Sequence, residues 1–142
     1  MTDAELLVQF EACALTEAQL DHRTHVKLGY LLLEEHGFEE ALARLRSNLP
    51  EINQRLDRPE GPLEGYNETT THAFLKLIQT TAAAYGELFP APNADAFCEA
   101  HPQLMNKHAL RFFYTPARRQ QPEAKTQFVE PDLTPLPKLP ED

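Results

Sequence analysis

Cysteine is scarce in this sequence of 142 residues, with Cys13 and Cys98 as its only two. Neither belongs to a Cys-x-x-Cys pair, which argues against a thiolate zinc site and against a dithiol redox couple. Both lie in apolar, helix-like contexts, and neither has a neighbouring base in the sequence. We therefore expect free, buried cysteines without a catalytic role.

Long apolar runs and basic residues are also in short supply. No run approaches the roughly 18 apolar residues needed to cross a bilayer, so we expect no membrane partner. The 13 Lys and Arg stand against 22 Asp and Glu, a formal charge of −9. Such a surface repels phosphate backbones, so we expect no nucleic-acid partner. Met1–Glu5 lacks a basic stretch before an apolar one, which predicts no secretory signal and a cytoplasmic location.

What the sequence does contain is helical periodicity, in a composition with 42% hydrophobic and 25% charged residues that is typical of a globular domain. We predict an all-α fold: a compact antiparallel bundle of four long helices, one or two short helices and a Pro-rich C-terminal tail. Pro50 falls within the third long helix and should kink or split it. The expected helices cover residues 3–14, 22–36, 38–56, 67–88, 93–100 and 105–113.

The composition changes after residue 115. Six of the 12 prolines lie in residues 116–142, where large apolar residues are few. We therefore predict a helical bundle over residues 1–115 and an extended tail over 116–142 that packs on it. Phe128, Val129 and Leu133 are its expected anchors, and residues 135–142 should be mobile.

The connectivity of the bundle predicts a site. Short connections make successive helices antiparallel, so the second and fourth helices run in the same direction and their N-termini share one end of the bundle. His22 and His25 are one turn apart at the start of the second helix, on the face that also carries Gly29. Gly29 has no side chain and allows the close approach of a helix or a ligand.

The fourth helix faces this turn with polar residues. Its core-facing stripe is apolar further along, but it begins with Asn67 and Thr71, and Tyr66 lies just outside the helix start. Glu68 and His72 occupy the adjoining flank. Two helix N-termini and this lining predict a polar pocket that suits an anionic group and keeps histidines neutral.

Several uses of this pocket follow from the same residues. His25 and His22 would act as bases or hydrogen-bond partners of a small polar or anionic ligand, oriented by Tyr66, Asn67, Glu68 and Thr71. No nucleophile–base pair is evident, so a ligand-binding protein and an accessory enzyme both stay open. Alternatively, a divalent metal would be held by His22, His25, Glu68 and His72, although no other cofactor is predicted. The histidines could equally be structural.

Features outside the pocket give further alternatives. Arg118 and Arg119 either pair with acidic helices or fold over the pocket mouth and hold an acidic ligand. An adaptor protein without a chemical site would present residues 128–139 as an extended recognition segment. A homodimer would form through the first helix or the last helix.

Three segments resemble an uncharacterised family of small bacterial all-helical proteins: residues 22–31, 41–45 and 66–71. The resemblance reaches residues 128–133 and so covers most of the chain. Members look like His-x-x-His on one helix and Tyr-His-x-Thr at the start of a later one. Asn67 takes the place of that later histidine here, and it is a poor ligand for a transition metal. The resemblance implies no established activity.

Overall fold

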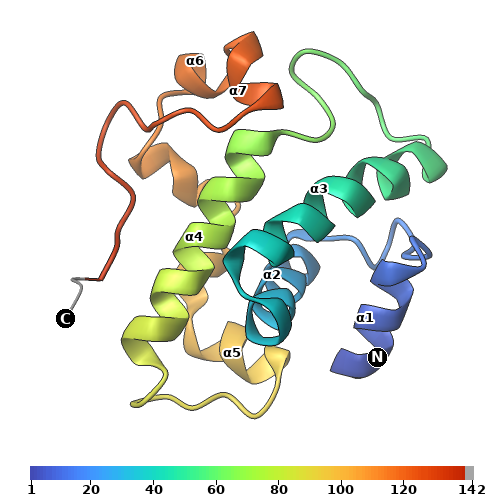
Figure 1. The fold of residues 1–142 in the computed structure, drawn as a ribbon, viewed down its shortest axis with the longest axis vertical. Coiled ribbons are helices and arrows are strands. Elements are labelled where there is room, and N and C mark those ends of the chain that lie inside the picture. Colours follow the sequence, from blue (N-terminus) through green and yellow to red (C-terminus); the bar gives the residue numbers. More distant parts are fainter. Residues whose placement is uncertain (140–142) are drawn as a thin grey trace.

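The computed structural model describes residues 1–139, and over this range the chain is all-α. Four longer helices pack together, and three short α-helices and two 3₁₀ turns (η1 and η2) surround them (Figure 1). No helix in this range combines the length and apolar character needed to span a membrane. The elements are α1 Asp3–Glu11, α2 His22–His36, α3 Phe38–Arg55, α4 Glu68–Tyr85, α5 Ala94–Ala100, η1 Pro102–Met105, η2 Ala109–Phe112, α6 Pro116–Arg119 and α7 Pro122–Thr126.

Side-chain caps fix where the main helices begin. The Asp21 side chain accepts a hydrogen bond from the Thr24 amide at 2.8 Å, and Asn67 does the same for the Thr70 amide at 2.9 Å. These contacts satisfy amides that have no partner within the first turn of a helix. Gly37 separates α2 from α3 with a φ of 80°, a conformation that glycine adopts without strain.

Two apolar clusters make up the interior, and α2 contributes to both. Leu28 and Leu32 of α2 pack with α1 and α3, whereas Val26 packs with α4, α5 and the tail. This double role places α2 at the centre of the fold. The first cluster includes Leu6, Phe10, Leu42, Leu49 and Ile52, and the second includes Ile78, Phe97, Leu110, Tyr114 and Val129.

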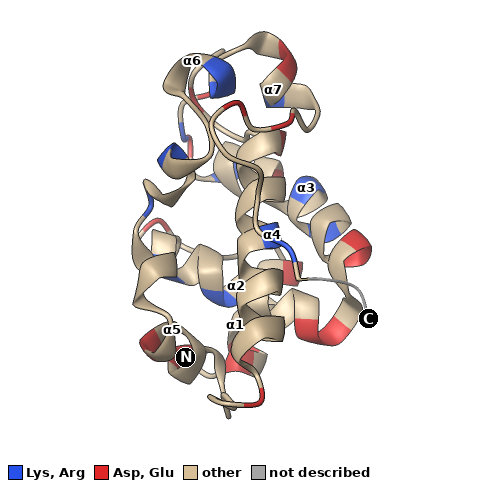
Figure 2. Ribbon diagram, turned by 90° about the vertical axis from the view of Figure 1, so that its left-hand side faces the viewer, with Lys and Arg blue, Asp and Glu red and all other residues tan. Residues whose placement is uncertain are grey.

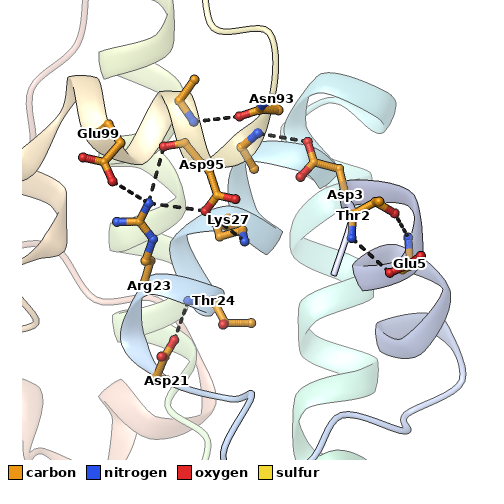
Figure 3. Close-up of polar contacts among 12 residues, drawn as sticks. Thr2, Asp3, Glu5, Asp21, Arg23, Thr24, Lys27, Asn93, Asp95 and Glu99 are labelled. Carbon is orange, nitrogen blue, oxygen red and sulfur yellow. Dashed lines mark hydrogen bonds and ion pairs between the residues drawn. The ribbon is translucent and has the colours of Figure 1, made fainter.

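Polar contacts fasten α5 across the first half of α2 (Figure 3). Arg23 binds Asp95 at 3.3 Å and Glu99 at 3.1 Å, and Lys27 binds Asp95 at 3.2 Å. The amide of Ala94, at the start of α5, donates to the Asp3 carboxylate of α1 at 2.9 Å. The contacts with Arg23 and Lys27 use side chains of α2 that line neither of the cavities described below.

Pro50 does not split α3, which is continuous from Phe38 to Arg55. The proline is exposed, so water can bond the Arg46 carbonyl that loses its intrahelical partner. The single helix expected over residues 105–113 is also wrong. Two 3₁₀ turns occupy this region, and between them the Asn106 side chain accepts from the His108 amide at 2.9 Å. That local bond competes with a continuous helix.

The tail is more structured than predicted. Pro116 and Pro122 occupy first-turn positions of α6 and α7, where a missing N–H costs nothing. Two of its side chains, Ala124 and Val129, are fully or almost fully buried. Both α6 and α7 lie beside the N-terminal end of α4 (Figure 1).

The last part of the chain follows α4. Leu136 packs against the second apolar cluster, and Thr80 donates to the carbonyl of Pro137 at 3.1 Å. These contacts hold part of the stretch that was expected to be mobile. The remainder of that prediction, residues 140–142, lies outside the described residues.

Candidate functional site

The site lies where α2 and α4 begin. The rings of His22 and Phe74 are 5.1 Å apart, and further along Gly29 faces Ile78 so closely that a Cβ there would lie 2.8 Å from Ile78 Cδ1. Contacts therefore advance in the same direction along both helices. This arrangement brings the two N-terminal turns together, as the connectivity predicts.

Two adjoining cavities occupy this end of the bundle. The larger has a volume of about 720 Å³ and is bounded by the starts of α2 and α4, the loop over residues 58–67, and α6 with its neighbours. The smaller has a volume of about 290 Å³ and runs between α2, α3 and α4. They share four lining residues, which are His25, Leu49, Thr70 and Thr71.

His25 is the only histidine that lines both cavities. Its Nδ1 bonds to the carbonyl of Asp21 at 2.8 Å, and Nε2 has no hydrogen-bond partner within residues 1–139. Burial lowers the pKa of His25, and the positive charge of Arg58 and the nearby His22 lower it further. The Asp21 carbonyl and carboxylate oppose this shift without reversing it. The ring is therefore neutral at pH 7, with an available Nε2 lone pair.

His22 has a structural bond in addition to its place at the smaller cavity. Its Nε2 donates to the carbonyl of Leu104 at 2.8 Å, which ties α2 to η1. The same nitrogen is therefore not available as a base. Each of the two histidines that the sequence pairs as catalytic has one ring nitrogen bonded to a carbonyl, and only His25 lines both cavities.

Tyr66, Asn67 and Thr71 also line the larger cavity, and Thr71 lines the smaller one as well. The side-chain oxygen of Asn67 is occupied as the cap of α4. The Tyr66 hydroxyl donates to Glu68 Oε1 at 2.8 Å, and burial with this acceptor raises the pKa of Tyr66. Tyr66 therefore lines the cavity as a neutral side chain, and its hydroxyl proton is used in the bond to Glu68.

Glu68 does not line either cavity, which corrects its assignment to the ligand pocket. Its side chain turns toward α3, where the guanidinium of Arg46 binds it twice, at 3.0 and 2.7 Å. Burial alone would raise the pKa of Glu68, but the bonds from Arg46 and Tyr66 outweigh burial and lower it. Glu68 is thus a buried structural anion.

His72 is also absent from the cavities. Its ring stacks on Phe128 of the tail, with ring centroids 3.9 Å apart. The ring of Phe38 packs edge-on against the same histidine, with a centroid distance of 5.2 Å. The proposed quartet of His22, His25, Glu68 and His72 therefore does not form. Within the described part of the chain, no group of three or more His, Cys, Asp or Glu is placed to hold a metal ion.

Four basic side chains complete the larger cavity, and only Arg119 among them belongs to one of the alternatives predicted from the sequence. Arg58 is occupied by Glu17 at 2.9 Å, and Lys125 by Glu60 at 2.7 Å, so these two cations are neutralised locally. Arg111 and Arg119 also line the cavity. Neither guanidinium forms an ion pair or a hydrogen bond with any residue from 1 to 139.

Arg119 is half-buried, and its Nε is buried without a hydrogen-bond partner in the described chain. Burial lowers the pKa of Arg119, and the charge of Arg111 beside it lowers it further. Figure 2 shows the basic residues of α6 at the end of the molecule that holds the start of α4. Only the Arg118–Arg119 doublet hinted at this cluster. Arg118 instead bonds within the tail, to the Glu130 carbonyl at 3.0 Å.

Two alternatives predicted from the sequence, an adaptor role and a homodimer, depend on the tail and on two exposed faces. Phe128 stacks on His72 and Val129 is buried, so Leu133 and Leu139 are the large exposed apolar side chains of the segment 128–139. Val8 of α1 and Phe112 of η2 are 68% and 74% exposed, so both faces named for a homodimer carry one apolar side chain in water. Dimerisation stays a prediction.

Comparisons with known proteins add no identity: no protein-family model, no curated protein and no solved structure matches this chain. The resemblance drawn from residues 22–31 and 66–71 therefore stays a prediction. The site rests on its own geometry.

Proposed function

We propose that this protein binds a small anionic molecule in the cavity between the starts of α2 and α4. The observation that carries the proposal is the pair of Arg111 and Arg119, which line that cavity without a partner in the described chain. Adjacent unpaired guanidinium groups repel each other, and a buried N–H without an acceptor costs about 1–3 kcal/mol. A bound carboxylate or phosphate relieves both penalties.

Other features of the cavity support the same ligand class. The two acidic side chains in the lining are Glu17 and Glu64, and Glu17 is held by Arg58. The sequence as a whole has a charge of −9, so a locally basic cavity is a departure from its average surface. His25 adds a nitrogen that can accept a ligand proton or, once protonated, donate to an anion.

The proposal is for binding, with catalysis left as an extension. His25 could serve as a general base, but Nε2 has no hydroxyl or thiol hydrogen-bonded to it in the described chain. A ligand-derived proton is thus the one that His25 could take. Any reaction would require the ligand to supply the reacting group.

Isothermal titration with acetate, inorganic phosphate and citrate tests the proposal directly. We expect saturable binding of at least one anion to the wild-type protein, and at least a tenfold loss of affinity in Arg119→Gln. Arg118→Gln is the matched control, because Arg118 is bonded within the tail and does not line the cavity. Equal affinities for all three proteins would refute the assignment.

Deletion of residues 117–142 is a poor substitute for these point variants. It removes Arg119 and Lys125 from the cavity wall, and it also removes the buried side chains of Ala124 and Val129. A truncated chain would lose binding by unfolding as readily as by losing the site.

A further inference from the structure

The smaller cavity differs in character from the larger one. The α2, α3 and α4 side chains around it are mostly apolar, and Val26, Leu45, Leu75 and Ile78 are all buried. No Asp or Glu lines it, and Lys107, between η1 and η2, is the one Lys or Arg in its lining. An apolar space of this kind holds a hydrocarbon group more readily than water, since water requires several polar partners.

The volume of this cavity limits what it can hold. An apolar protein cavity of about 150 Å³ accommodates a benzene ring. The smaller cavity, at about 290 Å³, is about twice that size. It therefore suits a chain or ring system of roughly ten carbons at most.

Gly29 lies in the lining of this space. Its missing side chain lets α4 approach α2 closely, because an added Cβ would lie 2.8 Å from the tip of Ile78 and 3.4 Å from the tip of Leu75. A helical glycine costs about 0.5–1 kcal/mol relative to alanine. The close approach of α4 gives a reason for retaining a costly residue in the middle of α2.

The junction of the two cavities joins an apolar compartment to a cationic one. His25, Thr70 and Thr71 line both spaces, and Arg111 and Arg119 line the larger space only. A molecule lying across the junction has its apolar part among the bundle helices and its charged part beside the guanidinium groups. The two halves of the site thus select opposite ends of one ligand.

Building on the proposed function, we infer that the ligand is an amphipathic carboxylate: its anionic head lies at Arg111 and Arg119, and its hydrocarbon chain or ring fills the cavity beside Gly29. The geometry assigns His25 and Thr71 to the junction, within the lining of both compartments. Recognition then combines charge pairing at one end with burial of apolar surface at the other.

Isothermal titration of the full chain with acetate, octanoate, 4-phenylbutyrate and octan-1-ol tests this inference. Each methylene that is fully buried strengthens binding about fourfold. We expect octanoate and 4-phenylbutyrate to bind at least a hundredfold more tightly than acetate, and octan-1-ol at least tenfold more weakly than octanoate. A chain series needs no variant, so protein folding does not affect its outcome.

Gly29→Ala provides the matching change in the protein. The added methyl pushes the tips of Ile78 and Leu75 toward the cavity that they line, so octanoate should bind at least fivefold more weakly while acetate is unaffected. Gly61→Ala is the control, because a Cβ at Gly61 would meet only Glu64 Oε2, at the ordinary distance of 4.0 Å. Octanoate affinity should not change in that variant.

The outcomes separate this inference from the proposed function. If acetate binds as tightly as octanoate, the apolar compartment is not used and the inference fails, while anion binding stands. If octan-1-ol matches octanoate, the head is not recognised as an anion and the inference fails. The inference also fails if none of these molecules binds, while the titration with acetate, phosphate and citrate decides the proposed function separately.

Discussion

Nδ1 of His25 donates a hydrogen bond to the carbonyl of Asp21, one helical turn earlier, over 2.8 Å. Because a carbonyl oxygen can only accept, this bond places the proton of the neutral ring on Nδ1. Nε2 then carries the lone pair, at the junction of the two cavities. The main chain of α2 thus sets the tautomer of the residue on which the chemistry of the site depends.

Anion binding should be coupled to protonation of His25. Without ligand, the pKa of His25 lies below 6.5, because the effects of burial, His22 and Arg58 outweigh the opposing effect of Asp21. A bound carboxylate beside the ring raises that pKa, so binding takes up a proton and strengthens as the pH falls. We expect octanoate affinity to increase by up to about tenfold per pH unit between pH 7.5 and pH 5.5.

His25→Asn isolates this effect. The asparagine amide can still donate to Asp21, whereas the titrating Nε2 is lost. Calorimetric affinities of this variant should be independent of pH over the same range, with a melting temperature close to that of the wild type. A wild-type affinity that is flat with pH, or that falls as the pH is lowered, would rule out His25 as an anion contact.

Arg119→Met should separate stability from binding. The variant removes a buried Nε that has no acceptor, so we expect stability to rise by about 1 kcal/mol, or a few degrees in melting temperature. Affinity for octanoate should fall at least tenfold. Thermal unfolding without ligand and titration with octanoate measure the two effects.

Arg118→Met is the appropriate comparison. It removes bonds to the Glu130 carbonyl and to Gln121, at 3.0 and 2.9 Å, so it should lower stability by about 1 kcal/mol and leave affinity unchanged. Similar behaviour of the two methionine variants would contradict a specific role for Arg119.

Glu68→Gln tests whether Glu68 acts as a buried structural anion. We expect a loss of about 2 kcal/mol of unfolding free energy, because Arg46 and Tyr66 lose a buried anionic acceptor. Glu11→Gln is the control: its ion pair with Arg44 is exposed and should be worth less than about 0.5 kcal/mol. Urea unfolding measures both, and equal losses would mean that Glu68 is not a special buried anion.

The helices were predictable because their signals are local. Asp21, Asn67 and Asn93 are of residue types that favour N-cap positions, and they cap α2, α4 and α5, while Gly37 directly follows α2. Local sequence signals do not predict the burial of a side chain by residues that are distant in the sequence. His101 caps the C-terminus of α5, as its place before Pro102 favours, but its side chain is 4% exposed because the rings of Tyr85 and Phe97 pack against it.

The candidate site divides in the same way. His25, Tyr66, Asn67 and Thr71 were predictable because helical spacing and connectivity place them at one end of α2 and α4. Arg111 was not, because nothing in its neighbourhood in the sequence reveals that η2 lies beside this end. Glu68 and His72 were misplaced because helical phase alone does not show that α3 and the tail supply their partners.

Tyr114→Phe should loosen the tail from the bundle. The Tyr114 hydroxyl donates to the carbonyl of Val129 at 2.7 Å inside the second apolar cluster, and its loss leaves a buried carbonyl without this donor. We expect a cost of about 1–2 kcal/mol and faster amide exchange at Val129, whose N–H bonds to Thr69. Tyr85→Phe, at a 42% exposed tyrosine, should cost little.

Stability should fall as the solution is acidified below pH 6.5, before the carboxylates titrate. Burial lowers the pKa of His25, His72 and His101 below the value of 6.5 that each has when unfolded. At pH 5–6 the unfolded chain therefore binds more protons than the folded one, and the equilibrium shifts toward unfolding. The loss begins near pH 6.5 and stops below the folded pKa values.

His72→Phe isolates one of these contributions. Phenylalanine can keep the stacking with Phe128, and it does not titrate. Glu68 and Glu39 favour the protonated form of His72, but burial, with Lys76 and Arg46, prevails. The difference in unfolding free energy between pH 8 and pH 5 should therefore shrink in the variant. Measurement at pH 8 serves as the internal reference, because the histidine is neutral there in both states, and an undiminished pH dependence would show that His72 titrates normally in the folded protein.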